Sequence, residues 1–290
     1  MRLRRTMLFM PGNNPGMIEN AGVYGADSII LDLEDAVSPN QKDAARLLVG
    51  EALKDVDFNG SEKVVRINSL DTFGMDDIKT IVPCCPDALI IPKVETADTI
   101  HKVSALVHQV NRVNYPIKFI ALIETPKGIA NSYEIAQSDP DLEALALGAE
   151  DYTASLGISR SKTGEEIYVA RSILVNSAAA GEIQSIDTPF TDVNDPIGLK
   201  ADVSCAKKMG FKGKLSINPR QLDIIHQVYK PSDDEIHWAT QIVVAIDAAE
   251  SSGAGVASIH GKMVDAPVVS RAKTILYLAE KMGIKGENKE

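Results

Sequence analysis

The sequence is poor in the residue types that usually reveal a zinc, disulfide or hydrolase site. Its three cysteines, Cys84, Cys85 and Cys205, form neither a CxxC pair nor a disulfide framework. The five histidines form no HxH or HExxH pair, which argues against a zinc or copper site. The phosphate-binding motif GxxxxGK[ST] and the nucleophile motif GxSxG are also missing. Any bound metal is therefore expected to have carboxylate ligands.

Long apolar runs are missing too. The sequence contains nothing close to the roughly 20 apolar residues of a membrane span, and Met7 to Met10 is too short a run before Pro11 for a signal peptide. The net charge of -10 and the pI near 5.1 argue against a nucleic-acid or membrane-surface partner. We therefore expect a cytoplasmic protein with no nucleic-acid or membrane partner, in which an anionic substrate needs a locally basic pocket.

Two carboxylates follow two apolar runs in the same way. Phe119–Ile123 stops at Glu124, and Ala144–Leu147 stops shortly before Asp151. Short continuous apolar runs predict strands buried on both faces, and the segment 128–137 between them has helical spacing. This β-α-β unit makes the strands parallel, so both carboxylates emerge at the sheet edge where α/β folds bind ligands.

Two neighbouring carboxylates repel unless a cation lies between them. A hard divalent ion with oxygen ligands, Mg²⁺, fits Glu124 and Asp151 best. The alternative is structural, with Glu124 as a salt-bridged helix start and Asp151 as a helix N-cap.

The whole chain repeats this alternation, which predicts a (β/α)₈ TIM barrel with a C-terminal helical extension. The expected strands are Met7–Met10, Ser28–Leu33, Lys63–Ile67, Ala88–Ile91, Phe119–Ile123, Ala144–Leu147, Gln184–Asp187 and Lys214–Ile217. They are followed by the polar groups Pro11-Gly12, Glu34-Asp35, Asn68, Lys93 with Glu95, Glu124, Glu150-Asp151, Asp187 and Asn218 with Arg220. A doubly wound sheet is the less favoured alternative, because it usually gathers such groups at one crevice.

Residues 1–230 are expected to form the barrel that carries the site. Residues 231–290 are expected to form a C-terminal extension, which is either a packing flap or an arm that contacts a neighbouring subunit. In that extension Asp265 precedes Pro267 at a turn, where position alone favours a helix N-cap over a site residue. Arg66 lies near the end of the third expected strand, where a solvated charge is unusual. It is either a site residue or a structural partner of Asp32 or Glu34.

Eight motifs in order resemble the citrate lyase β-subunit family, which includes malyl-CoA and citramalyl-CoA lyases on a (β/α)₈ barrel. The motifs are RRTMLFMPGNN at 4–14, LDLEDAV at 31–37, VVRIN at 64–68, IPKVE at 91–95, IETPKG at 123–128, LGAEDY at 147–152, INPRQ at 217–221 and GKMVDAP at 261–267. The segment 218–229 is most similar to the β subunits of citrate lyase.

The resemblance implies roles for individual residues. Glu124 and Asp151 would bind Mg²⁺, with Glu124 also facing the substrate, and Arg66 would contact substrate as a catalytic residue. Arg5, Lys42 and Arg46 would contact the carrier of the thioester. Asp265 would reach the active site of a neighbouring subunit and act as a catalytic acid, which implies a homotrimer or hexamer.

The backbone amides of Gly148, Ala149 and Glu150 are a further expectation from the residues themselves. They precede a helix, where N–H groups favour an anion, so we expect them to hold a substrate carboxylate.

The implied function is Mg²⁺-dependent carbon–carbon cleavage of a citryl thioester, bound to CoA or acyl carrier protein, into oxaloacetate and an acetyl thioester. Citrate lyase α and γ subunits are possible partners. The main alternative is a free-standing malyl-CoA or citramalyl-CoA lyase, or a related thioesterase or synthase. A non-catalytic barrel subunit and a metal-dependent 2-oxo-acid aldolase are weaker alternatives, because the acidic pair is retained and no histidine falls at an expected strand end.

Overall fold

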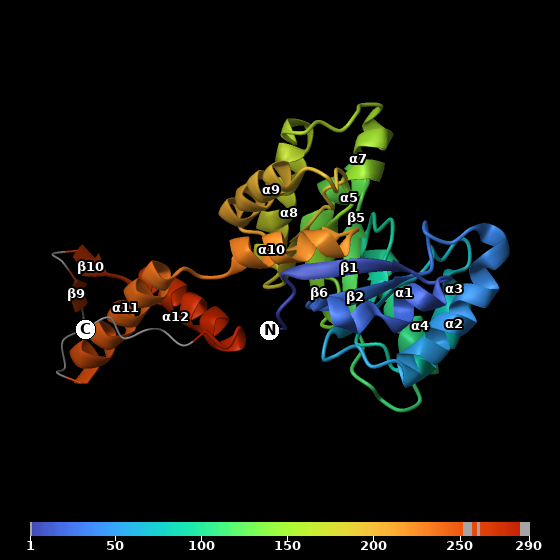
Figure 1. Cartoon of the computed structure of the whole chain (residues 1–290), viewed down its shortest axis with the longest axis horizontal. Coiled ribbons are helices and arrows are strands. Elements are labelled where there is room, and N and C mark those ends of the chain that lie inside the picture. The colour runs from blue at the N-terminus through green and yellow to red at the C-terminus, as the bar shows by residue number, and fades with distance from the viewer. Residues whose placement is uncertain (1, 252–256, 260–261, 285–290) are drawn as a thin grey trace. The chain divides into compact units, whose positions relative to one another are not determined.

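Eight parallel strands close into a barrel in the computed structural model, which describes residues 2–251, 257–259 and 262–284 (Figure 1). The strands are β1 Thr6–Pro11, β2 Ser28–Asp32, β3 Glu62–Arg66, β4 Ala88–Ile91, β5 Lys118–Ile123, β6 Leu142–Leu147, β7 Gln184–Asp187 and β8 Gly213–Ser216. Each strand pairs with the next in sequence, and β1 pairs with β8 to close the ring. The predicted (β/α)₈ barrel is confirmed.

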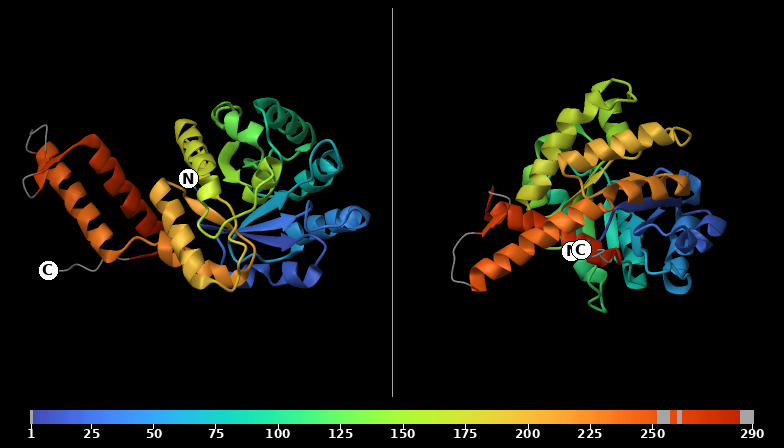
Figure 2. Two further views of the ribbon diagram at one scale, coloured as in Figure 1. Left: turned by 90° about the horizontal axis from the view of Figure 1, so that it is seen from above. Right: turned by 60° about the vertical axis from the view of Figure 1, so that its left-hand side comes forward.

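Helices surround the strands (Figure 2). They are α1 Pro15–Glu19, α2 Lys42–Asp55, α3 Gly74–Ile81, α4 Ala97–Val110, α5 Pro126–Ala130, α6 Ser132–Ala136, α7 Ala149–Leu156, α8 Tyr168–Ala180, α9 Pro196–Met209 and α10 Leu222–Tyr229. Short 3-10 turns cover Ala21–Tyr24, Pro39–Gln41, Val82–Cys84, Glu165–Ile167 and Pro219–Gln221. Within the described residues, none of the helices combines the length and the apolar content needed to cross a membrane.

The helix expected at 128–137 is two short helices, α5 and α6. They are separated at Asn131, whose backbone departs from helical geometry (φ -98°, ψ 4°). Its side-chain amide donates to the carbonyl oxygen of Glu95 at 2.8 Å. This side-chain bond gives Asn131 a partner outside the helix, which explains why a pattern with helical spacing is interrupted there.

Two apolar layers explain why the strands are continuously apolar. One layer fills the barrel and includes Met7, Ile30, Val64, Leu122 and Ile186. The other lies between the strands and the helices. Since successive residues of a strand point to opposite faces, every second residue belongs to the barrel interior. This alternation decides which residues at the strand ends face the barrel axis.

The chain divides into two units, one up to His226 and one from Gln227 onward, so the division falls inside α10. The second unit contains α11 Asp233–Ser251, the antiparallel strands β9 Ala257–Ile259 and β10 Lys262–Val264, and α12 Ala266–Lys281. Buried residues of α11 and α12 form its core together with Val264. The contact of this unit with a neighbouring subunit remains a prediction.

Candidate active site

A cavity of 460 Å³ lies at the carboxyl ends of the barrel strands. Six of the predicted site residues line it: Arg66, Glu124, Gly148, Ala149, Glu150 and Asp151. The other lining residues are Phe9, Pro11, Met17, Asp32, Asp35, Ala36, Leu122, Thr188, Pro189, Leu215 and Ile217. The structure therefore brings together residues from β3, β5, β6 and the start of α7 that are far apart in the sequence.

Glu124 follows β5 and has the same parity as Leu122, so its carboxylate faces the barrel interior. Its side chain is buried, and its Oε1 accepts a hydrogen bond from the backbone N–H of Lys93 at 2.7 Å. Lys93 has φ of 52°, in the left-handed region that non-glycine residues seldom adopt. The loop after β4 thus adopts an unusual conformation and contributes an N–H group that fixes Glu124.

Gly148 provides the space that Glu124 occupies. Ile123 and Leu147 are paired in the register of β5 and β6, so the next residues, Glu124 and Gly148, are neighbours. A Cβ atom at position 148 would lie only 2.5 Å from the Cβ of Glu124. The glycine of the LGAEDY motif is therefore explained by the close approach of this carboxylate to the backbone.

The electrostatic surroundings of Glu124 favour a bound cation. Burial, together with the nearby carboxylates of Glu34 and Asp151, raises the pKa of Glu124 to about 8, although the Lys93 N–H and Arg66 act in the opposite direction. Burial disfavours the charged carboxylate, and the two neighbouring acids add repulsion between like charges. A divalent cation would relieve this repulsion.

Asp151 is the second carboxylate that could hold Mg²⁺ beside Glu124. It lies half-buried in the first turn of α7, whose N-cap is Gly148, so it is not the helix N-cap that we considered as an alternative. In the described part of the chain, neither carboxylate forms an ion pair within 4 Å. The same residues contain no cluster of three or more side chains that could hold a metal ion. Mg²⁺ commonly binds one or two carboxylates and completes its shell with water and substrate, so this donor pair fits Mg²⁺ better than a metal that needs a full protein cage.

Arg66 faces the same cavity from β3 and is held by acidic residues. Asp32 is its register partner on β2, and Nε and Nη2 of Arg66 donate to the two carboxylate oxygens of Asp32 at 2.7 and 2.6 Å. Nη1 lies 2.9 Å from Glu34, and the guanidinium carbon lies 4.9 Å from the centroid of the Phe9 ring. The structural pairing that we considered as an alternative is present, and it holds a fixed positive charge at the cavity wall.

Lys42 is turned to the protein and does not line the cavity, and its expected contact with the thioester carrier stays a prediction. Its Nζ is buried and donates to the carbonyl oxygens of Leu33 and Glu34 at 2.7 and 2.6 Å. It thereby holds the loop after β2. Arg46 is similarly engaged, because it pairs with Asp43 and Asp77, both at 2.8 Å.

Arg5 lies at the end of the barrel opposite the cavity, and its expected contact with the thioester carrier stays a prediction. It directly precedes β1, whereas Glu124 directly follows β5, and the strands are parallel. Its guanidinium pairs with Asp27, just before β2, through hydrogen bonds of 2.8 and 2.7 Å. Arg5 is therefore not part of the cavity at the carboxyl ends.

Two of the three backbone amides expected to bind substrate already have protein acceptors. The N–H of Gly148 donates to the carbonyl oxygen of Ile123 at 3.0 Å, and the N–H of Ala149 donates to Oγ1 of Thr188 at 3.1 Å. The next amides, those of Glu150 and Asp151, belong to the first turn of α7, which leaves N–H groups without partners inside the helix. The N–H groups that could hold an anion are therefore those of Glu150 and Asp151.

Asp187, the last residue of β7, and Asn68, which comes shortly after β3, face the layer between the strands and the helices. Arg171 donates to both carboxylate oxygens of Asp187 at 2.8 Å, and Lys214 donates to one of them at 2.6 Å. Asn68 donates to the carbonyl oxygen of Leu33 at 2.9 Å. Both residues support the barrel from outside.

Sequence reasoning missed Thr188 as a site residue. We assigned the polar group after β7 to Asp187, but Ile186 points into the barrel, so Thr188, two residues later, shares its face. Counting alternate residues from Ile186 would have identified it.

Asp265 lies in the second unit as the N-cap of α12, and its carboxylate accepts from the backbone N–H of Val268 at 3.2 Å. Position alone favoured this role. The inter-subunit role that the family resemblance implies stays a prediction.

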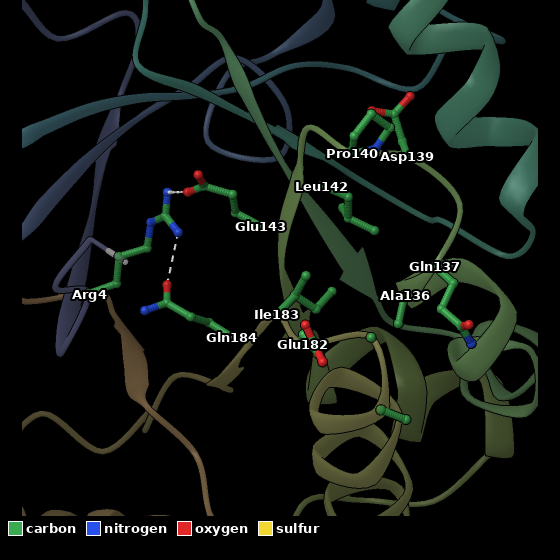
Figure 3. A pocket seen from close by; sticks show the side chains of 12 residues that line it. Arg4, Ala136, Gln137, Asp139, Pro140, Leu142, Glu143, Glu182, Ile183 and Gln184 are labelled. Atoms are coloured by element: carbon green, nitrogen blue, oxygen red, sulfur yellow. Dashed lines mark hydrogen bonds and ion pairs between the residues drawn. The ribbon is translucent and has the colours of Figure 1, made fainter. Parts of the chain in front are cut away.

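A larger cavity, of 750 Å³, lies among the loops at the amino ends of the strands (Figure 3). Arg4, the cation among its lining residues, donates to Gln184 at 2.8 Å and to Glu143 at 2.6 Å, as the dashed lines in Figure 3 show. Its remaining hydrogen bonds go to Glu62, at 2.8 and 2.7 Å. Since this arginine is fully engaged and the predicted metal residues lie elsewhere, size alone does not identify the active site.

Comparisons with known proteins show the family to which the chain is similar. The model of the family "HpcH/HpaI aldolase/citrate lyase" matches residues 5–219. Citrate lyase subunit beta of Leuconostoc mesenteroides subsp. cremoris is 44% identical over 283 residues, which cover 96% of this chain and 94% of that protein. The L-malyl-CoA/beta-methylmalyl-CoA lyase of Cereibacter sphaeroides is 34% identical over 303 residues, which cover 96% and 95%.

A solved structure shows that the similarity extends to the three-dimensional fold. The protein CitE from Mycobacterium tuberculosis, in complex with magnesium, acetoacetate and coenzyme A, has a TM-score of 0.77 and 30% sequence identity. The similarity covers 97% of this chain and 100% of that chain. The chain therefore belongs to the HpcH/HpaI aldolase/citrate lyase family.

Proposed function

We propose that this chain is a Mg²⁺-dependent carbon–carbon lyase that cleaves a citryl thioester into oxaloacetate and an acetyl thioester, as the β subunit of a citrate lyase does. The observation that carries the proposal is the cavity that joins the buried carboxylate of Glu124 to Asp151 and the guanidinium of Arg66. Relatives called citrate lyase subunit beta reach 44% identity, whereas the malyl-CoA lyases reach 34%. This difference favours the citryl substrate.

Glu124 and Asp151 are the residues that would hold Mg²⁺. When bound, Mg²⁺ supplies a Lewis acid for the hydroxyl and carboxylate oxygens of a hydroxy acid. One solved relative is described as a citrate lyase beta subunit complexed with oxaloacetate and magnesium, which supports this choice of metal. The apolar wall formed by Phe9, Leu122 and Leu215 limits water beside the site.

Arg66 is suited to the charge that develops during cleavage. The bond between the hydroxyl-bearing carbon and the carbon next to the thioester breaks, and its electron pair moves into an enolate whose oxygen becomes negative. A base takes the hydroxyl proton as the carbonyl group of the oxo acid forms. A guanidinium held in place by Asp32 stabilises the enolate oxygen without having to reorganise, which is usually the largest contribution to catalysis.

The enolate then needs a proton on carbon. Asp265, supplied by a neighbouring subunit, is our candidate for the acid, as the family resemblance implies. A shared site requires a homo-oligomer, for which a trimer or hexamer is the proposed assembly. We further propose that α and γ subunits of citrate lyase are partners, with the acyl group carried on the γ subunit or on CoA.

The experiment that tests this function compares citryl-CoA, malyl-CoA and citramalyl-CoA as substrates of the purified chain with Mg²⁺. We expect citryl-CoA to have the highest kcat/KM, with oxaloacetate as a product. A higher kcat/KM for malyl-CoA or citramalyl-CoA would support the free-standing lyase instead. Turnover of none of the three, by folded protein supplied with Mg²⁺, would favour a non-catalytic role. Co-purification of a carrier subunit with the tagged chain tests the partner proposal separately.

A further inference from the structure

Thr188 occupies a position in the cavity that the mechanism above leaves unused. It directly follows β7 and lies on the face of Ile186, so it points toward the barrel axis. Its side chain is fully buried and lines the 460 Å³ cavity beside the first turn of α7. A buried polar side chain at a cavity wall normally has hydrogen-bond partners for all of its groups.

The hydroxyl of Thr188 has only part of its hydrogen-bonding capacity used. Its Oγ1 accepts from the N–H of Ala149 at 3.1 Å. A hydroxyl also carries one hydrogen of its own to donate, and within the described residues no acceptor lies at hydrogen-bonding distance from it. Because a buried donor without an acceptor is unfavourable, this hydrogen is suited to an oxygen atom supplied by a ligand.

The position of Thr188 in the ring indicates which end of the substrate supplies that oxygen. Arg66 stands at the end of β3 and Thr188 after β7, four strands apart in a ring of eight, so they face each other across the barrel. Glu124 and Asp151, after β5 and β6, lie between them. If Arg66 holds the thioester-derived enolate, Thr188 lies at the end where the oxo acid forms.

We propose that the Thr188 hydroxyl is a substrate-contacting, specificity-determining donor that binds a carboxylate or carbonyl oxygen of the oxo-acid part of the substrate. This inference rests on the proposed function, since it assigns the two ends of a thioester that is cleaved. Thr188 thereby acts together with the first-turn amides of α7, while its acceptor side keeps Ala149 in place. It selects for substrates that carry an oxygen at this end.

The test uses Thr188→Val, which keeps the shape but removes the hydroxyl, and Thr188→Ser, which keeps the hydroxyl. Binding of oxaloacetate at saturating Mg²⁺, of Mg²⁺ alone and of acetyl-CoA is measured by calorimetry on the whole chain. We expect Thr188→Val to weaken oxaloacetate binding by roughly 10- to 100-fold, the effect of losing one buried hydrogen bond. Thr188→Ser should bind oxaloacetate almost as the unmodified protein does.

The affinities for Mg²⁺ and acetyl-CoA separate this role from a structural one. Thr188→Val should leave both unchanged. A parallel loss of Mg²⁺ affinity would mean that Thr188 only holds α7 and Asp151 in place, and a selective loss of acetyl-CoA binding would put the hydroxyl at the other end of the substrate; either result overturns the proposal. Unchanged oxaloacetate binding in Thr188→Val overturns it as well.

Two combinations of results distinguish a failure of this proposal from a failure of the proposed function. If the unmodified chain cleaves citryl-CoA while Thr188→Val binds oxaloacetate normally, only the role of Thr188 fails. If the unmodified chain neither cleaves citryl-CoA nor binds oxaloacetate, the proposed function fails with it. Should Thr188→Val fail to fold, Thr188→Cys, which keeps the volume with a much weaker donor, replaces it and should show the same selective loss.

Discussion

A Cβ atom on Gly148 would lie 2.5 Å from the Cβ of Glu124 and 2.6 Å from its Oε2, closer than non-bonded atoms approach. Glu124 sits against bare backbone, and any side chain at position 148 must displace it. The glycine is needed here for space and not for its backbone angles, since its φ of -99° suits any residue.

We therefore expect Gly148→Ala to weaken Mg²⁺ binding and to lower the free energy of unfolding by about 1–3 kcal/mol, the usual cost of overpacking. Calorimetry with Mg²⁺ and urea unfolding measure the two effects. Gly50→Ala is the matched control, because its added Cβ would lie at an ordinary 3.4 Å from Sγ of Cys84 and should leave Mg²⁺ binding unchanged. Normal Mg²⁺ affinity in Gly148→Ala would show that Glu124 is not a ligand in this conformation.

Removing either carboxylate of the proposed metal pair should abolish Mg²⁺-dependent cleavage. Lewis-acid stabilisation amounts to several kcal/mol, which corresponds to a loss of roughly 10³-fold or more in kcat. We expect this of both Glu124→Ala and Asp151→Ala in folded protein, measured with citryl-CoA over a range of Mg²⁺ concentrations. Glu134→Gln on α6, an exposed acid, serves as control. Near-normal turnover in either alanine variant removes that residue from the metal site.

Binding of Mg²⁺ should depend on pH, because burial raises the pKa of Glu124 to about 8. Below that pH the free protein carries a proton on Glu124 that Mg²⁺ must displace, so the apparent affinity should rise about tenfold per pH unit up to about pH 8 and then level off. Calorimetry in buffers of different ionisation enthalpy measures the released proton. An affinity that stays constant from about pH 6 to pH 8 would contradict the assignment.

The same raised pKa makes a prediction for stability in the absence of metal. The folded state binds the Glu124 proton more tightly than the unfolded chain, whose pKa is near the ordinary 4.5. Stability should therefore fall as the pH rises from about 4.5 to about 8. Glu124→Gln, which does not titrate, should lose this part of the pH dependence in urea unfolding.

The shared active site predicts complementation between two inactive proteins. Asp265→Asn lacks the proposed acid, and Arg66→Ala lacks the positive charge that stabilises the enolate oxygen. When the subunits of the two variants exchange, some active sites should combine an intact Arg66 with an intact Asp265, and part of the activity should return. Asparagine caps a helix about as well as aspartate, so Asp265→Asn should keep α12 intact. Without recovery after proven exchange, the inter-subunit role would have no support.

The fold was predictable because the signals for it are local. Apolar runs such as Ala88–Ile91, each ended by polar residues, indicate strands buried on both faces. The strands β9 and β10 were not predicted, because each has only three residues. The helix after β5 was expected as one piece because spacing does not show the bond from Asn131 to Glu95, 36 residues away. Glu124, Arg66 and Asp151 were predicted as site residues for the same reason, since the first two stand at strand ends and Asp151 follows β6 in the first turn of α7.

The sequence by itself determined the ring of strands and the end of the barrel at which Glu124, Asp151 and Arg66 lie. Strand periodicity and chain order depend on neighbouring residues alone. Only the tertiary structure decided which polar groups face the axis. It turned Asp187 outward and Thr188 inward, placed Arg5 at the far end and used Lys42 to hold a loop. The physical reason is that the face to which a side chain points depends on the pairing register between strands. Hydrogen-bond partners such as Thr188 and Ala149 lie 39 residues apart and meet only when β6 and β7 pair.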